Sequence, residues 1–101
     1  MATLINELKV IGDVEDFERI TAGITEYMRQ QPGYISHRML RSLRRPGVFV
    51  EIAEWERPED HVRAVQSEGF RSRVQELAGV IEKPSPDLYE PVHESSAAPA
   101  A

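Results

Sequence analysis

The chain has 101 residues, of which 41% are hydrophobic, and its net charge is −5. This length and composition predict one globular domain, and the acidic balance argues against nucleic acid as a partner. The chain has no cysteine, which excludes disulfides and thiolate sites, and no signal peptide or membrane-spanning stretch is recognisable, so we expect a cytoplasmic protein.

The first third of the chain shows a strand pattern followed by a helix pattern. Residues 3–10 alternate between apolar and polar side chains, which predicts a strand that Gly12 ends. Asp13 is expected to cap a helix. The apolar residues of this helix recur every three or four positions and are Phe17, Ile20, Ile24, Tyr27 and Met28. The Pro-Gly pair at 32–33 ends it.

Two further strands are predicted over residues 34–43 and 48–57, joined by a turn at 44–47. In the second of these strands, one face carries Val48, Val50 and Ile52, and the other face carries Phe49, Glu51, Ala53 and Trp55. A strand that is apolar on both faces is typical of a sheet covered on both sides. An unpaired carboxylate on such a face is costly, so Glu51 is the first candidate functional residue.

The last third of the chain predicts helices and a short strand. One helix is expected from Pro58 to about Val65. A second begins at Ser67, with an apolar stripe formed by Phe70, Val74, Leu77, Ala78 and Ile81. Residues 83–86 are a proline-rich break, and residues 87–92 predict the last strand. Residues 1–92 are therefore expected to form the domain, and residues 93–101 a disordered tail without large apolar anchors.

The order strand, helix, strand, strand, helix, strand predicts an α+β fold of the ferredoxin-like, split β-α-β type with a four-stranded antiparallel sheet. Helices can cover only one face of such a sheet. Because the strand at 48–57 is apolar on both faces, the open face needs a partner, most simply a second copy of the chain. We therefore expect a homodimer.

Three segments resemble the antibiotic biosynthesis monooxygenase family. They are Gln31–Ser36, Ala53–Glu56 and Ser67–Arg71, and the resemblance covers about residues 3–92. It implies a dimeric α+β barrel and monooxygenase activity. One branch of the family oxidises phenolic polyketides such as anthrones without metal or organic cofactor, some related enzymes use reduced flavin, and another branch degrades haem.

The resemblance carries over residue by residue. Trp55 matches a tryptophan of the anthrone-oxidising branch and Arg71 a helix-borne arginine, whereas Glu51 stands where that branch has asparagine and His61 where it has tyrosine. Asn6 and Trp55 also match the haem-degrading branch. Its ligand position falls at or beside Val74, which cannot bind iron, so we do not expect haem.

Oxidation of a phenol by O2 requires a base for the phenolic proton, an apolar place for the ring and a group that stabilises developing negative charge. We assign Glu51 and His37 as candidate bases and Trp55 as a stacking surface. Asn6, His61 and Arg71 are candidate substrate-binding residues. The three histidines are scattered in the sequence, so no metal site is expected.

Each of these residues also has a simpler interpretation. Trp55 could serve core packing, and Asn6 could satisfy a local backbone group. Glu51 could pair with an arginine of the strand at 34–43, and the two histidines could be solvated or structural.

Two functions of different classes follow. The first is a small oxygenase or oxidase of secondary metabolism that acts on a phenolic polycyclic aromatic, of anthrone or hydroquinone type, with O2 and without bound metal. Reduced flavin stays open as a co-reactant. The second is a non-redox, cyclase-like or binding helper for polyketides. Haem degradation is the least favoured alternative.

Overall fold

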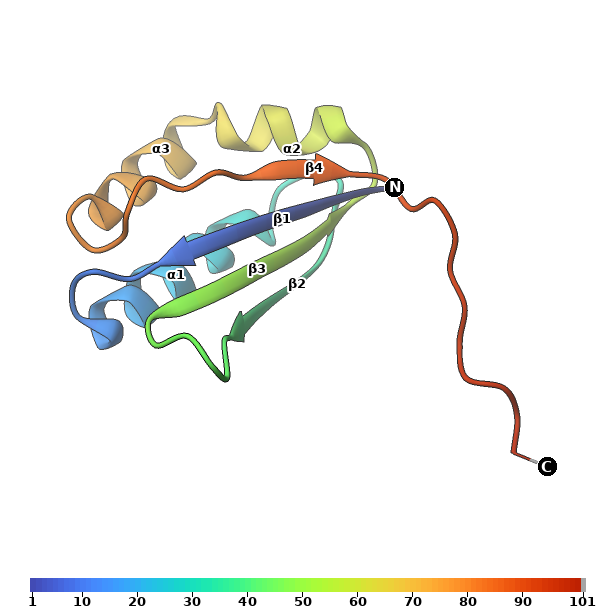
Figure 1. The fold of residues 1–101 in the computed structure, drawn as a ribbon. Coiled ribbons are helices and arrows are strands. Elements are labelled where there is room, and N and C mark those ends of the chain that lie inside the picture. Colours follow the sequence, from blue (N-terminus) through green and yellow to red (C-terminus); the bar gives the residue numbers. More distant parts are fainter. Residues whose placement is uncertain (101) are drawn as a thin grey trace.

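A four-stranded antiparallel sheet forms one layer of the protein and three helices form the other (Figure 1). The structure is a computed structural model that describes residues 1–100. Its elements follow the order β1 (Ala2–Lys9), α1 (Val14–Met28), β2 (Tyr34–Arg41), β3 (Val48–Trp55), α2 (Pro58–Val65), α3 (Glu68–Val74) and β4 (Asp87–Tyr89), with a 3-10 turn at Gln75–Leu77 before β4. The predicted α+β, ferredoxin-like fold is confirmed.

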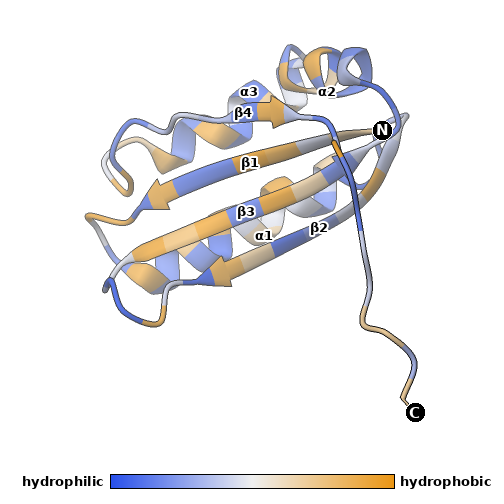
Figure 2. Cartoon of the chain, turned by 45° about the vertical axis from the view of Figure 1, so that its right-hand side comes forward, coloured by the Kyte–Doolittle hydropathy of each residue, from blue (hydrophilic) through white to orange (hydrophobic). Residues whose placement is uncertain are grey.

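The sheet has the strand order β2-β3-β1-β4, so the chemically unusual strand β3 lies in its interior. β3 pairs with β1 along its whole length and with β2 as a hairpin. Hydrophobic residues run along much of β3 (Figure 2). One of its faces packs against the helices, where Trp55 is 1% exposed, and the other face is open.

Helix α1 begins and packs as its sequence predicts. The carboxylate of Asp13 accepts a hydrogen bond from the backbone N–H of Asp16 at 3.1 Å, which caps the first turn. The predicted stripe faces the sheet, and its buried members are Phe17, Ile20, Ile24 and Met28. Phe17 is fully buried and packs on Phe49 of β3, with 4.7 Å between ring centroids.

The last helix is shorter than predicted. The apolar stripe suggested a helix that reaches Ile81, but α3 ends at Val74 and Ala78 is exposed. Gly79 adopts a φ of 81°, which turns the chain back toward the end of β1. Ile81 then forms a β-bridge with Val10, and this tertiary pairing replaces the helical hydrogen bonds that periodicity predicted.

The strand β4 ends at Tyr89, earlier than predicted, and residues 90–100 form neither helix nor strand and extend away from the sheet (Figure 1). The predicted tail at 93–101 is described up to residue 100, and residue 101 lies outside the described residues. Within the described part of the chain, no helix is both long and apolar enough to cross a membrane.

Candidate active site

A cavity of about 270 Å³ lies between the helix-facing side of the sheet and the three helices. Its volume is near the lower end of the range for small-molecule pockets, ~300–1,000 Å³. Most of the wall is apolar, and the polar side chains in it are Asn6, Thr25, Tyr34, His37, Glu51, Trp55 and His61. The cavity therefore combines an apolar wall with a few converging polar groups, which is typical of a ligand site.

A carboxylate and an imidazole meet in the wall of this cavity. Nε2 of His37 lies 3.0 Å from Oε2 of Glu51, and the two side chains are 14% and 20% exposed. The register of β1 and β3 sets Asn6 directly opposite Glu51, and Nδ2 of Asn6 donates to Oε1 of Glu51 at 3.4 Å. Both carboxylate oxygens are thus hydrogen-bonded, which orients the group.

The alternative pairing of Glu51 with an arginine of β2 is not found. Arg38 lies opposite Ile52 and faces the open side of the sheet. Arg41 faces the helices but forms an ion pair with Glu18 of α1 at 2.9 Å. Among the described residues, the titratable side chain in contact with Glu51 is His37.

A β-bulge in β2 brings Tyr34 to the cavity. Strict alternation would place Tyr34 and His37 on opposite faces, because they are three residues apart. The β2–β3 ladder contains a β-bulge between Tyr34 and Ser36, which restores both side chains to the cavity side. Ile35, at the bulge, is 47% exposed. Tyr34 is therefore a site residue that the alternation pattern missed.

Three aromatic side chains form one end of the cavity. Tyr34 and His61 both approach Trp55 edge-on, with ring centroids 5.4 Å and 5.6 Å from the indole. His61 was expected at a substrate-binding position or exposed, and it is half-buried in the cavity wall. Together the three rings form an apolar aromatic surface in the same cavity as the Glu51 carboxylate.

Three buried polar atoms of this wall have no hydrogen-bond partner among the described residues. They are Oδ1 of Asn6, Nε1 of Trp55 and Nδ1 of His61. Buried polar atoms in folded proteins are normally paired, so a cluster of unpaired ones around a cavity indicates groups that a ligand can satisfy. The side-chain amide of Asn6 directs its Nδ2 donor toward the Glu51 carboxylate, and this leaves its acceptor Oδ1 without a partner.

Two titratable side chains of the cavity wall are uncharged at neutral pH, and burial shifts the pKa of each further in that direction. It lowers the pKa of His61 below its usual 6.5, with partial opposition from the negative charge of Glu51. It raises the pKa of Tyr34 above its usual 10.0, an effect that Arg29 opposes and Glu51 reinforces. His61 is therefore a neutral imidazole and Tyr34 a neutral phenol.

The structure does not bring Arg71 to the cavity. Helix α3 lines it with Phe70 and Val74, which are four residues apart and share a face. Arg71 follows Phe70 by about 100° around the helix axis, and it is exposed. Its neighbour Arg73 stacks on Tyr27, with 4.6 Å from the guanidinium carbon to the ring centroid. The predicted place of Arg71 in the pocket is therefore corrected.

Two prolines complete the wall. Pro84 and Pro86 line the cavity and are also exposed, so they lie at its mouth. Lys83 precedes the two prolines and Ser85 lies between them. Both line a different surface depression, because side chains alternate between the two sides of an extended segment.

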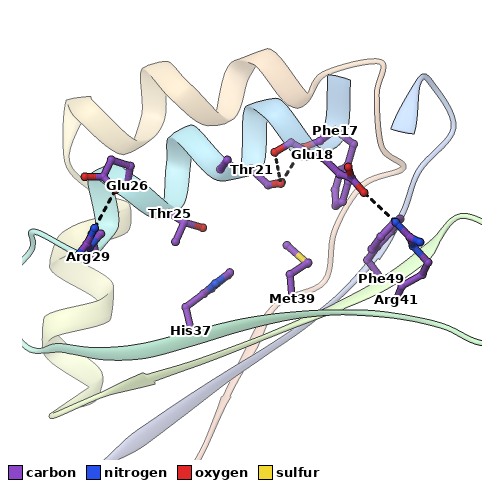
Figure 3. A pocket seen from close by; sticks show the side chains of 11 residues that line it. Phe17, Glu18, Thr21, Thr25, Glu26, Arg29, His37, Met39, Arg41 and Phe49 are labelled. Carbon is purple, nitrogen blue, oxygen red and sulfur yellow. Dashed lines mark hydrogen bonds and ion pairs between the residues drawn. The ribbon is translucent and has the colours of Figure 1, made fainter. Parts of the chain in front are cut away.

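An open groove runs beside the cavity, between α1 and β2. Figure 3 shows His37 and Met39 of β2 pointing toward Thr25 and Thr21 of α1. The groove has a volume of about 670 Å³, and His37 and Thr25 line both it and the enclosed cavity. His37 thus stands between the interior and solvent.

No group of three or more His, Cys, Asp or Glu side chains in residues 1–100 is arranged to hold a metal ion. The helix α3 carries no histidine, and at the position predicted for a haem ligand Val74 presents an apolar side chain to the cavity.

Comparison with known proteins agrees with this fold. The family model for antibiotic biosynthesis monooxygenases matches residues 1–76. Deoxynogalonate monooxygenase of Streptomyces nogalater is 31% identical over 68 residues, which cover 67% of this chain and 58% of that protein. The matched region thus spans less than two thirds of this curated relative.

Solved structures extend the likeness over most of the chain. SnoaB, a cofactor-independent oxygenase from Streptomyces nogalater, has a TM-score of 0.87 and 25% identity, over 92% of this chain and 94% of its own. A protein from Nitrosomonas europaea has a TM-score of 0.80 and 20% identity, over 92% of this chain and 100% of its own, which supports the fold alone.

Proposed function

Because the chain belongs to the antibiotic biosynthesis monooxygenase family, we propose that it is an O2-dependent monooxygenase acting on a phenolic polycyclic aromatic of anthrone or hydroquinone type. The observation that carries this proposal is the His37–Glu51 pair, 3.0 Å apart, in the wall of an enclosed apolar cavity. Catalysis without metal, flavin or haem is part of the proposal, and the description of SnoaB as cofactor-independent supports it.

The His37–Glu51 pair accepts the phenolic proton in this mechanism. Its two members are in hydrogen-bond contact, so they act on the proton together. An imidazole that donates Nε2–H to the carboxylate keeps its lone pair on Nδ1. Because His37 also lines the open groove, it offers the proton a route to water.

The remaining wall holds the ring and its developing charge. Trp55 and Tyr34 supply aromatic surface, and the apolar side chains around them exclude water. The unpaired N–H of Trp55 can donate to an oxygen of the substrate as negative charge develops there.

The electron balance needs no further reductant. The phenolate transfers one electron to O2, and the resulting pair combines at the activated ring carbon to form a hydroperoxide. Loss of water then leaves a carbonyl, so one oxygen atom enters the product and the other becomes water. The substrate itself supplies the electrons, as a CH2 group of an anthrone is converted to C=O.

The sharpest test removes each member of the pair, and Glu51→Gln does so without changing the shape of the side chain. Glu51→Gln and His37→Ala should each lower O2 uptake with a dihydroxyanthrone by about 10²- to 10⁴-fold, the usual contribution of a positioned acid or base. Added reduced flavin should leave the wild-type rate of quinone formation unchanged. Full O2 uptake in both variants would contradict the assigned proton transfer.

Glu54→Gln is the matched control. Glu54 lies on the same strand, faces the opposite side of the sheet and accepts a hydrogen bond from the Thr3 hydroxyl at 2.7 Å. Glutamine retains that acceptor, so this variant should keep the wild-type rate.

A non-redox cyclase is the second candidate, because the same pair could remove a proton from a carbon next to a carbonyl. Labelled O2 separates the two functions. An oxygenase consumes O2 in proportion to product and incorporates one labelled atom, whereas a cyclase forms product with no O2 uptake.

A further inference from the structure

One charged side chain is buried among the described residues, and the mechanism above does not use it. Asp60, in the first turn of α2, is 4% exposed. Its Oδ1 lies 3.4 Å from Nη2 of Arg57 and 3.3 Å from Nη1 of Arg63, and these arginine side chains are 65% and 62% exposed. Pairs with solvated arginines contribute little to stability, so they do not by themselves explain why this carboxylate is buried.

The other side of the Asp60 carboxylate packs against the backbone just before β2. A Cβ built on Gly33 would overlap Cβ, Cγ and Oδ2 of Asp60, so glycine leaves the room that the carboxylate occupies. The carbonyl of Gly33 also accepts a hydrogen bond from the backbone N–H of Glu56 at 2.8 Å. Gly33 therefore joins the first turn of α2 and the end of β3 to the entry of β2.

This junction is directly connected to the aromatic end of the cavity. Each residue of the junction is a neighbour in sequence of one aromatic residue, and the pairs are Gly33 with Tyr34, Glu56 with Trp55, and Asp60 with His61. Tyr34 and His61 both lie edge-on to Trp55. Because consecutive Cα atoms are about 3.8 Å apart, a shift of α2 against β2 would move these rings relative to one another.

We propose that Asp60 is a positioning residue for substrate binding, which holds α2 against the entry of β2 and so fixes the two aromatic edges around Trp55. The inference rests on the proposed function only in taking the ligand to be a flat aromatic compound. Asp60 does not line the cavity, so it acts through the rings rather than by touching the substrate. Aromatic walls that are already held in place bind a flat ligand with little loss of side-chain freedom.

The His37–Glu51 pair is held by different contacts. The ladders of β3 with β2 and with β1 position both side chains within the sheet. A displaced α2 should therefore weaken the binding of an aromatic ring more than it slows proton transfer. In steady-state kinetics with a dihydroxyanthrone, such a change raises KM and leaves kcat near the wild-type value.

Two substitutions of Asp60 separate shape from charge. Asp60→Glu keeps the charge but adds one methylene where the carboxylate already meets Gly33, so it should push α2 away from β2. Asp60→Asn removes the charge but keeps the shape and an acceptor for the arginines. Glu59→Asp is the matched control, because Glu59 is the exposed carboxylate next to Asp60 in the same helical turn.

Trp55 provides the readout, because it is the one tryptophan in the sequence and it lines the cavity. Quenching of its fluorescence by a dihydroxyanthraquinone, which resembles the product, gives the dissociation constant. Asp60→Glu should raise this constant at least about fivefold and Asp60→Asn no more than about twofold, while Glu59→Asp should leave it unchanged. Without ligand, the emission of Trp55, which is 1% exposed, should move to longer wavelength in folded Asp60→Glu as water reaches the ring.

A role in stability alone would give a different result. If Asp60→Glu unfolds at lower urea concentration but binds the quinone and emits like the wild type, Asp60 only stabilises the fold and the proposal is overturned. An equal loss of binding in Asp60→Asn would overturn it too, because charge rather than packing would then matter. Asp60→Ala removes the contact instead of crowding it, and it should change binding and emission in the same direction as Asp60→Glu.

The outcome is independent of turnover. If the expected order of binding holds but no anthrone consumes O2, the proposed oxygenase activity fails and the positioning role stands. If the wild type consumes O2 and Asp60→Glu keeps the wild-type KM and emission, the positioning role fails and the activity stands. A wild type that does not bind the quinone would overturn the aromatic site and, with it, the role of Asp60.

Discussion

The buried imidazole of His61 should make the stability of the folded protein depend on pH. Burial lowers its pKa in the folded state, while the unfolded chain keeps a pKa near 6.5. Below pH 6.5 the unfolded state therefore binds more protons than the folded state, so the free energy of unfolding falls as the pH is lowered. It stops falling once the pH passes below the pKa of the folded state.

This prediction can be checked by urea unfolding at pH 7 and pH 5. His61→Gln should show a smaller loss of stability between the two pH values than the wild type. The exposed His93 provides the control, since His93→Gln should leave the difference unchanged. An undiminished pH dependence in His61→Gln would mean that other groups cause it.

Single residues also show where the sequence was informative about the site. Glu51 and Trp55 were placed on one face by strand alternation, and the structure brings both to the cavity. The same rule would separate Tyr34 from His37, whereas the bulge at Ile35 brings both to the cavity. Arg71 was assigned from a resemblance alone, without the helical phase that turns it outward.

At the scale of elements, a glycine sets how closely α3 approaches α1. A Cβ built on Gly69 would overlap the ring of Tyr27. The Tyr27 hydroxyl donates to Oγ of Ser67 at 2.9 Å, and Ser67 in turn caps α3 by accepting from the Phe70 N–H. Because Phe70 and Val74 of this helix line the cavity, the contact also positions the site wall.

Two glycine-to-alanine changes should have opposite signs. Gly69→Ala is expected to lower the stability by about 1–3 kcal/mol, the usual cost of overpacking. Gly23→Ala, in the middle of α1 with nothing within 4 Å of the added methyl, should raise it by about 0.5–1 kcal/mol through higher helix propensity. Thermal unfolding of both variants measures this. A stabilised Gly69→Ala would show that α3 is loosely held.

The order and type of the elements followed from periodicity and from glycine and proline positions, and the hairpin β2–β3 was predicted by its turn. The end of α3 was not predicted correctly. Leu77 and Ile81 continue the helical spacing of Phe70 and Val74, but Ile81 pairs with Val10, about seventy residues earlier in the sequence. Local patterns carry no information about such a distant partner.

At the scale of the whole molecule, the open face of the sheet argues for a partner. Apolar side chains remain exposed on it, including Ile5, Leu40 and Tyr89 at 37%, 41% and 50%. Ile5 lies opposite Ile52, and Leu40 lies opposite Val50, so these residues form one continuous surface. At about 25 cal/mol per Å² of apolar area, covering it would be favourable by several kcal/mol.

We therefore expect a homodimer joined through this face. Sedimentation at micromolar concentration should show the dimer for the wild type and a monomer for Ile52→Glu. Val62→Glu, an equivalent change at an exposed position of α2, should remain dimeric. A wild-type monomer under these conditions would refute the expectation.

The C-terminal tail should be dispensable for folding. Residues 95–100 are exposed and carry no large apolar side chain. Truncation after Glu94 should therefore change the melting temperature by less than about 4 °C, which corresponds to ~1 kcal/mol for a domain of this size. A larger drop would show that the tail contacts the domain or its dimer.

The two prolines at the cavity mouth have a kinetic consequence. Proline fixes its φ angle near −65° and loses little conformational freedom when the chain folds. Pro84 and Pro86 therefore give the mouth a stiff edge, in contrast to a mobile lid that closes over its ligand. Ligand association should then proceed in one step, and its observed rate should rise linearly with ligand concentration without the plateau that a closing lid imposes.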